Sequence, residues 1–443
     1  MDFFHRLFAG VTCRRAAWPL VVAILYLPAE AVVAQKGELL TLPDAIARTL
    51  AQNPQLAVFP LQRKKLAGAA RTAALRPAFD FRFETERKHF GGDEPDEAPD
   101  PEDAAANELE LVVALSSVIE LGGKRQMRVD VVSAQLDVLI AEEQARALDL
   151  LGEVIRRYTQ VLAAEELVVL AKEKVSLARE TLKMVSERVI AAASPVSERM
   201  RAESTLAKAV LAEQSEQSML VYRKYALSAL WGQPEQAFDV DARALYRFAP
   251  GASFEELYAR AQENPAIARF ASEERLRASQ LRLVQANSSP DLGWYAGVLV
   301  NRAVDETTAL AGFNLPLFTA KRNRGALISA TAELEAMALR RKAALLQLYP
   351  QLYLAVSNRK QALDTVFTLQ DSVIPNLRQA LGEVERSYRH GRDSYLDLIA
   401  AREALIGAER ARIEAARSVL LFGAEIEQLT AGPLGPLGLE SRQ

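Results

Sequence analysis

The sequence predicts a mainly α-helical fold with a membrane β-barrel portion, built from two structural repeats. Three observations predict it: a matched pair of Asn-Pro segments, four short alternating segments, and two long helical tracts that each fold back once. Each repeat is therefore expected to supply one long helical hairpin and one pair of strands. The repeat outweighs the chain length of 443 residues, which alone would suggest about three domains.

The N-terminal residues 1–34 are expected to be a secretory signal peptide. Basic residues precede an apolar run over 16–27, and small residues follow it. This run of about 12 residues is shorter than the roughly 20 that a spanning helix needs. The one cysteine, Cys13, lies in this segment, so the mature chain is expected to form no disulfide and no thiolate metal site. No later apolar stretch suits a spanning helix, which leaves a periplasmic, secreted or outer-membrane barrel protein.

The composition argues against two classes of function. The 54 basic and 57 acidic residues give a net charge of −3 without a basic block, so no nucleic-acid partner is expected. Three histidines, one cysteine and the lack of a glycine-rich phosphate loop leave no catalytic constellation and no resident metal or cofactor site. The chain is therefore predicted not to be an enzyme.

The two repeats are expected to occupy residues 35–232 and 233–432, with a C-terminal tail over 433–443. Their starts are marked by "LPDAIARTLAQNPQLAVF" and "FEELYARAQENPAIARF", in which Asn53-Pro54 matches Asn264-Pro265. In each copy a short helical pattern stops at the Asn-Pro step and a new helix starts behind it.

A strand pair is expected over about 79–118 in the first repeat and about 291–317 in the second. In "FDFRFETER", Phe79, Phe81 and Phe83 alternate with charged residues, a period of two that fits a strand. The four segments are about 9 to 11 residues long, which suits tilted strands that cross a bilayer with apolar residues toward lipid. Water-soluble hairpins also alternate, so a periplasmic coiled-coil scaffold stays open as a remote alternative.

Four strands cannot close a barrel alone, because an open edge would leave backbone groups unpaired in hydrocarbon. Several chains would then share one barrel. Two chains give eight strands, whereas three give twelve and a wider lumen. Both are possible on this argument, and a conduit favours three.

The long helical hairpins are expected over about 124–232 and about 321–430. The outgoing part of the first contains one glycine, Gly152, and no proline, which predicts a helix on the order of 100 Å long. Alanine-rich returning segments favour close packing in a coiled coil. Pro350 and Pro375 predict kinks or a local break in the second hairpin.

Each hairpin folds back at a short turn. In "RSYRHGRDSYLDLIAARE", residues 386–403, Gly391 provides the backbone freedom that a tight turn needs. Ala193-Ser194-Pro195 is the equivalent point of the first hairpin. Both turns are expected to be tips at one end of a helical tube.

Four motifs carry a resemblance to a known family: "SSVIELGGKR" at 116–125, "ASPVSERMRAE" at 193–203, "LWG" at 230–232, and the Asn-Pro step of both repeats. On these motifs the sequence resembles the TolC-like outer-membrane efflux family, and within it the CzcC-like branch of heavy-metal efflux systems. The likeness covers essentially the whole mature chain.

The resemblance implies a homotrimer in the outer membrane of a Gram-negative bacterium. A twelve-stranded β-barrel would lie above a long α-helical coiled-coil barrel in the periplasm. The implied partners are a periplasmic adaptor (membrane fusion) protein, an inner-membrane transporter of the resistance-nodulation-division (RND) class, and outer-membrane lipid. The implied function is a passive conduit that exports divalent heavy-metal cations, with drugs or secreted polypeptide as the alternative cargo.

The resemblance also implies a gate at the tips. By motif position Tyr388 is similar to the family's gate tyrosine, Asp397 to its ring aspartate and Glu198 to an acidic gate residue. The family's arginine, two residues after the turn glycine, is replaced by Asp393, with Arg392 beside it. Three copies of Asp397 around an aperture would favour cations. Acidic residues in the first turn of a helix, Glu198 included, also act as caps.

The same turns are expected to contact the adaptor. The expected contact residues are Ser194, Pro195 and Val196 in the first turn, and His390, Gly391 and Arg392 in the second. His390 could suggest a metal site, but three symmetry copies of a histidine at an exposed tip more often contact an adaptor.

Overall fold

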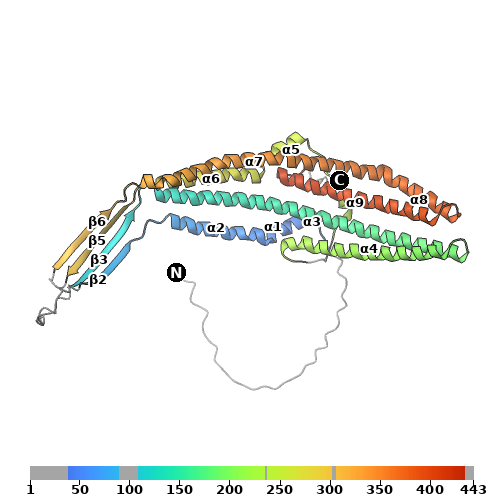
Figure 1. Ribbon diagram of the computed structural model, residues 1–443, viewed down its shortest axis with the longest axis horizontal. Coiled ribbons are helices and arrows are strands. Elements are labelled where there is room, and N and C mark those ends of the chain that lie inside the picture. Colours follow the sequence, from blue (N-terminus) through green and yellow to red (C-terminus); the bar gives the residue numbers. More distant parts are fainter. Residues whose placement is uncertain (1–37, 89–107, 235–236, 302–305, 435–443) are drawn as a thin grey trace, which may run out of the picture. The chain divides into compact units, whose positions relative to one another are not determined.

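The computed structural model describes residues 38–88, 108–234, 237–301 and 306–434, and helices dominate these ranges (Figure 1). The expected leader over 1–34 and most of the expected tail over 433–443 lie outside the described residues. The helices are α1 (Leu42–Gln52), α2 (Pro54–Ala73), α3 (Lys124–Ile190), α4 (Val196–Ser228), α5 (Phe254–Gln262), α6 (Pro265–Ala286), α7 (Thr319–Thr368), α8 (Ile374–Arg389) and α9 (Tyr395–Thr430). The strands are β1 (Glu38–Leu39), β2 (Asp80–Lys88), β3 (Glu108–Ile119), β4 (Phe238–Asp239), β5 (Leu292–Asn301) and β6 (Glu306–Asn314).

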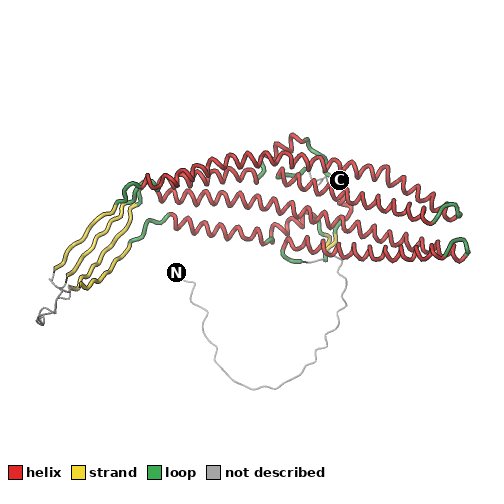
Figure 2. The backbone as a smooth tube through the Cα atoms, viewed as in Figure 1, coloured by secondary structure: helices red, strands yellow, loops and turns green. Residues whose placement is uncertain are grey.

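Strands β2, β3, β5 and β6 form one antiparallel sheet in that order, so both repeats contribute a strand pair to a single sheet (Figure 2). The prediction of four strands is confirmed. The outer strands β2 and β6 are each paired along one side only within the described chain. A second, parallel pair of two-residue strands, β1 and β4, was not expected from the sequence.

The register of the large sheet gathers apolar side chains on one face, whereas the rows of the other face mix charged and apolar residues. Phe83 lies opposite Val113, which lies opposite Val298, and the row ends at Ala309. The row through Phe81 is likewise apolar; its other members are Leu115, Ala296 and Ala311. Because neighbours along a strand point to opposite faces, Arg82 and Glu84 lie on the other face. Phe81 and Phe83 are 70% and 61% exposed in the single chain, so this apolar face is uncovered.

The "ELGGKR" motif forms the junction between the sheet and the helices. Gly122 has φ +75°, and an added Cβ there would lie 2.8 Å from the Ser289 hydroxyl oxygen, so the turn requires glycine. Lys124 then donates from Nζ to the Ser289 carbonyl (2.9 Å) and to Asp291 Oδ1 (2.7 Å). The motif thereby joins the start of α3 to the second repeat.

Helix α3 has 67 residues and packs against α4, α6 and α9 along its length (Figure 1). Helix α7 continues through Pro350 without a break. A π-helical turn, Leu369–Val373, separates α7 from α8, and Pro375 lies in the first turn of α8, where a missing amide hydrogen is tolerated. The irregularity beside Pro375 is therefore a π-bulge within a continuous helical backbone, and α7 is not broken at Pro350. None of the described helices has a stretch apolar and long enough to cross a bilayer.

The Asn-Pro steps have the same role in both repeats. Asn53 accepts the Gln55 amide (2.8 Å) and donates to the Leu230 carbonyl (2.6 Å). Asn264 accepts the Ala266 amide (2.7 Å) and donates to the carbonyls of Gln428 (2.8 Å) and Leu429 (2.9 Å). Each buried asparagine thus caps the helix that follows it and holds the end of its repeat's returning segment.

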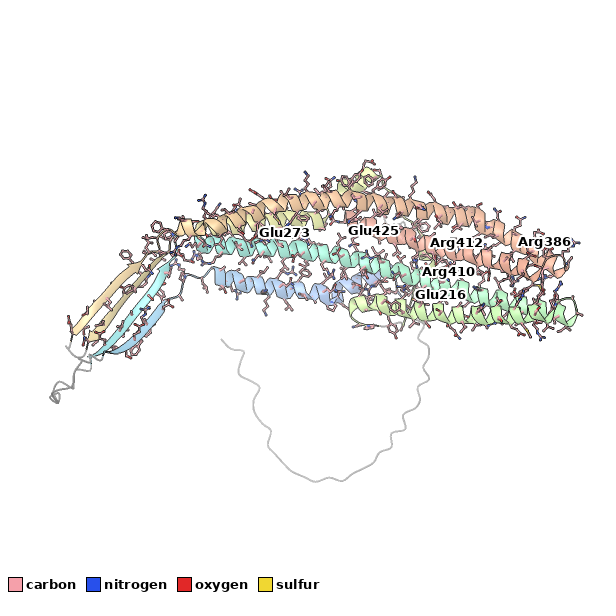
Figure 3. The ribbon with its side chains drawn as sticks, viewed as in Figure 1. Glu216, Glu273, Arg386, Arg410, Arg412 and Glu425 are labelled. Carbon is pink, nitrogen blue, oxygen red and sulfur yellow. The ribbon has the colours of Figure 1, made fainter. Side chains whose placement is uncertain are left out.

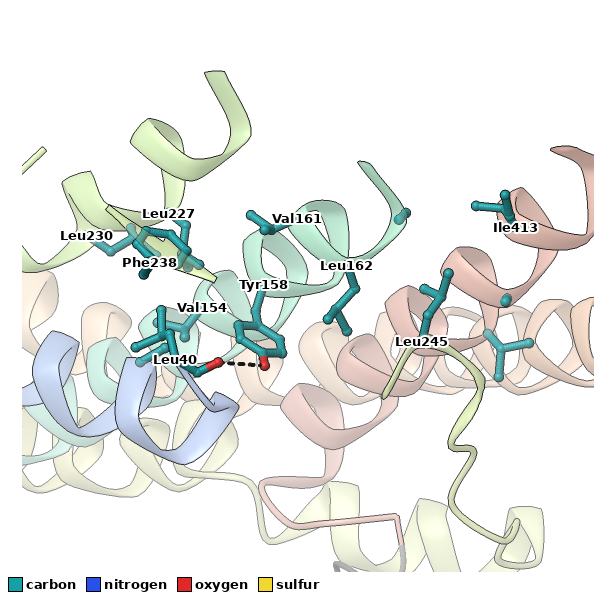
Figure 4. Packing of buried hydrophobic residues seen from close by; sticks show 14 of the residues in the cluster. Leu40, Val154, Tyr158, Val161, Leu162, Leu227, Leu230, Phe238, Leu245 and Ile413 are labelled. Atoms are coloured by element: carbon teal, nitrogen blue, oxygen red, sulfur yellow. Dashed lines mark hydrogen bonds between the residues drawn. The ribbon is translucent and has the colours of Figure 1, made fainter. Parts of the chain in front are cut away.

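The largest apolar cluster lies midway along the helices, where α1, α3, α4 and α9 meet (Figure 4). Tyr158 of α3 is buried there and donates its hydroxyl to the Leu40 carbonyl at 3.1 Å. Burial raises the pKa of Tyr158 from 10.0 to about 12, so the hydroxyl stays protonated and can donate well above neutral pH.

Candidate functional site at the helical tips

The turns α3–α4 and α8–α9 lie at the same end of the helices, and Arg386 of α8 lies there too (Figures 1 and 3). In the second turn Gly391 has φ +75°, and the Arg392 amide donates to the Ser387 carbonyl at 3.0 Å. In the first turn Ala192 has φ +53°, and the Ala193 amide donates to the Arg188 carbonyl at 2.8 Å. Both helices end in the same left-handed closure, although the first uses alanine.

Tyr388 is almost fully buried, with 1% of its surface exposed, in an apolar cluster that also contains Val185 of α3 and Leu398 of α9. Its hydroxyl donates to Glu198 Oε2 of α4 at 3.2 Å. Burial raises the pKa of Tyr388 above its ordinary value of 10.0, so the phenol, already protonated at neutral pH, remains a donor in mildly alkaline solution as well. The structure thus brings together Tyr388 and Glu198, two residues that the motifs singled out separately.

Arg188, which the sequence reasoning did not select, lies between the two turns. It donates from Nη1 to the Tyr388 carbonyl (2.5 Å), from Nη2 to the Ala193 carbonyl (3.1 Å) and from Nε to the Ser194 hydroxyl (3.0 Å). Its guanidinium carbon also lies 4.7 Å from the centre of the Tyr388 ring. Apart from its place in the last turn of a helix, no sequence signal marks this arginine.

Asp397 is engaged in a helix cap. Its Oδ2 accepts the Ser394 amide (3.0 Å) and the Ser394 hydroxyl (2.6 Å), while the Asp397 amide donates back to Ser394 Oγ (3.2 Å). This capping box starts α9. The pKa of Asp397 is lowered, mainly by the hydrogen bond from the Ser394 side chain and to a smaller extent by the bond from the Ser394 backbone amide. Within one chain, Asp397 is therefore an exposed capping carboxylate, and its ring role stays a prediction.

The remaining tip residues face outward. Pro195 precedes α4, and Val196 is 49% exposed. His390, Gly391 and Arg392 are exposed at the second turn, and Asp393 is partly exposed. In the described part of the chain, the side chains of Arg392 and Asp393 make no hydrogen bond or ion pair.

Further polar contacts hold the hairpins together behind the tips. The buried Arg402 of α9 donates to the Leu177 carbonyl and the Thr181 hydroxyl of α3, and it forms an ion pair with Glu385 of α8. Farther back, Arg410 of α9 lies 3.3 Å from Glu216 of α4 (Figure 3). Over the described residues, no group of three or more His, Cys, Asp and Glu side chains is placed to hold a metal ion.

The sequence of both repeats matches the model of a protein family. The family model described as "Outer membrane efflux protein" matches residues 45–233 and 257–432, one segment in each repeat. The chain belongs to the outer membrane efflux protein family. This efflux protein is accordingly an outer-membrane protein of an efflux family and not of a family of enzymes.

Its sequence is similar to the cobalt-zinc-cadmium resistance protein CzcC of Cupriavidus metallidurans (strain ATCC 43123 / DSM 2839 / NBRC 102507 / CH34). The two are 28% identical over 293 residues, which span 66% of this chain and 69% of CzcC. The fold is similar to crystal structures of CusC (TM-score 0.72, 15% identity, 92% of this chain and 96% of CusC). It is also similar to VceC of Vibrio cholerae (TM-score 0.68, 19% identity, 89% of this chain and 96% of VceC).

Proposed function

We propose that this efflux protein is the outer-membrane conduit of a tripartite pump that exports divalent heavy-metal cations. The observation that supports heavy-metal cations as the cargo is the 28% identity with the cobalt-zinc-cadmium resistance protein CzcC. The proposed partners are a periplasmic adaptor protein and an inner-membrane RND transporter. The metal is cargo, and it passes through the channel without a resident site.

The proposed conduit is a homotrimer. Each chain has one uncovered apolar sheet face and two strand edges, on β2 and β6, that have no partner in the described chain. Hydrocarbon does not tolerate unpaired edges, so β6 of one copy would pair with β2 of the next. Three copies would close a barrel of twelve strands with Phe81 and Phe83 toward lipid.

The proposed gate lies at the tips. The Tyr388–Glu198 hydrogen bond joins α8 to α4 and would restrain the aperture in the resting state. Three copies of Asp397 would add negative potential near the passage and favour cations. The exposed turns, with Val196 on one and His390 and Arg392 on the other, are the proposed contacts for the adaptor.

The cargo is tested by deleting the chain in its native bacterium and restoring it from a plasmid. We expect the deletion strain to lose growth on cobalt, zinc or cadmium salts and to keep its tolerance of organic dyes and bile salts. The restored strain should regain metal tolerance. Sensitivity to dyes and bile salts alone would assign the conduit to drugs. Recovery of the protein in the periplasmic fraction without detergent would contradict the conduit itself.

A further inference from the structure

One guanidinium joins the two tips. Arg188 is at the C-terminal end of α3, and its donors reach the carbonyl of Tyr388 at the end of α8 as well as Ala193 and Ser194 of its own turn. A fourth, longer contact of 3.5 Å reaches the Arg389 carbonyl. The donors of a guanidinium lie in one plane in a fixed fork, so one side chain can bind acceptors on both turns at once.

The cross-tip acceptors, the carbonyls of Tyr388 and Arg389, lie in the last turn of α8, where carbonyls have no partner within the helix, whereas Ala193 and Ser194 belong to the turn that follows α3. The last carbonyls of α3 and α8 point out of their helices, and the negative ends of both helix dipoles meet near the guanidinium. The positive charge of Arg188 therefore stabilises both ends together. Its carbon also lies over the Tyr388 ring at 4.7 Å, which adds a cation–π contact to the same residue whose carbonyl it binds.

Few other polar contacts cross between the tips. Across the described residues of the two turns, the hydrogen bonds from one hairpin to the other come from Arg188 and Tyr388. The next such tie is Arg402, which binds α3 at Leu177 and Thr181, more than one helical turn behind Arg188. Separation of the tips therefore requires the contacts of Arg188 to break.

We propose that Arg188 is the positioning residue that holds the tip of the α8–α9 hairpin against the tip of the α3–α4 hairpin in the resting channel. The inference deepens the proposed function, since it names the residue that sets the resting state of the proposed gate. The cross-tip acceptors of Arg188 are backbone carbonyls, those of Tyr388 and Arg389 at the end of α8. Release of this contact requires a displacement of the tips.

The test measures the distance between the tips by pulsed electron paramagnetic resonance in the detergent-purified oligomer. Nitroxide labels are placed at Ile190→Cys and His390→Cys, both exposed, in a Cys13→Ser chain diluted with unlabelled chains. A second label pair, Lys183→Cys and Ser204→Cys, reports on the α3–α4 hairpin alone. The compared variants are Arg188→Ala, Arg188→Lys and the matched control Arg386→Ala. Among the described residues, the polar contacts of Arg386 are with Gly382 and Glu383 of its own helix.

We expect a longer or broader tip distance in Arg188→Ala and an intermediate one in Arg188→Lys, because an ammonium group cannot bind both turns in the same way. Arg386→Ala should match the parent, and the label pair within the α3–α4 hairpin should be unchanged in all variants. An Arg188→Ala distance equal to the parent's overturns the proposal. A change in both label pairs also overturns it, because that marks a general loss of structure.

Conductance across a planar bilayer separates this inference from the proposed function. If the tips of Arg188→Ala are farther apart, the resting conductance of this variant should be several-fold higher than that of the parent. A widened distance in a trimeric, inserted protein that passes no current in any variant supports the role of Arg188 in holding the tips and contradicts the conduit.

Discussion

At the scale of the residue, the tips hold two buried tyrosines that differ in one respect. Tyr388 and Tyr395 share one apolar cluster, with 1% and 4% of their surfaces exposed. The Tyr388 hydroxyl donates to Glu198, whereas the Tyr395 hydroxyl has no hydrogen-bond partner among the described residues. A buried hydroxyl without a partner has a desolvation cost that no hydrogen bond offsets. Removing the hydroxyl oxygen should therefore affect stability differently at the two tyrosines.

We therefore predict that Tyr388→Phe destabilises the tip by about 1–2 kcal/mol, since it removes a hydrogen bond to a charged acceptor. Tyr395→Phe should be neutral or stabilising. Hydrogen–deuterium exchange of the amides at the end of α8 measures both, with faster exchange expected in Tyr388→Phe alone. Equal acceleration in both variants would show that Tyr395 finds an acceptor in the oligomer.

Acid should weaken the cap of α9. Hydrogen bonds from Ser394 lower the pKa of Asp397 from its ordinary value of 3.8. A carboxyl group with a lowered folded-state pKa stabilises the fold above its unfolded pKa, and this contribution is lost as the pH falls through the lower, folded value. In the wild type, we expect the protection of the Ser394 and Asp397 amides from hydrogen exchange to decrease when the pH is lowered below about 4. In Asp397→Ala this pH-dependent decrease should be absent. A wild type without the decrease would contradict the cap.

At the scale of the element, the two Asn-Pro steps show how one dipeptide starts a helix and holds another. Asn264 caps α6 and also binds the last carbonyls of α9. We predict that Asn264→Ala lowers stability by about 1–3 kcal/mol, because a cap is lost and two buried carbonyls lose a donor. The control is Asn376→Ala, which changes an exposed position inside α8 and should be neutral or slightly stabilising. Thermal unfolding followed by circular dichroism compares them, and equal transition temperatures would contradict the role of Asn264.

At the scale of the whole molecule, the sheet has an apolar face that a single chain does not cover. If this face contacts lipid in the trimer, Phe83→Arg should cost about 2–4 kcal/mol near the bilayer centre, while Glu84→Arg, on the opposite face, should be tolerated. The loss of the exposed Arg82–Glu84 contact adds little in the second variant. The fraction of chains recovered as inserted oligomer measures both. Equal recovery would place Phe83 away from lipid.

By itself the sequence determined the repeats, the four strands, the long helical hairpins and the positions of their turns. Each of these follows from a local pattern: an alternation of two for β2, the absence of proline from α3, and a glycine at 391 where the backbone is left-handed. The motifs also singled out Tyr388 and Glu198, which the fold then joined by a hydrogen bond.

Only the tertiary structure decided which groups meet across the chain. Arg188 binds the carbonyl of a residue 200 positions away, and every residue has such a carbonyl, so nothing in the sequence marks the partner. The contact of Arg402 with the Leu177 carbonyl could not be predicted from the sequence for the same reason, since its acceptor is also a backbone carbonyl. Asp397 is a case in which the sequence alone allowed two roles, because a carboxylate at the start of a helix is compatible with a helix cap and with the ring position of the motif. Its cap was settled by the distance to Ser394, a local geometry that the folded chain fixes.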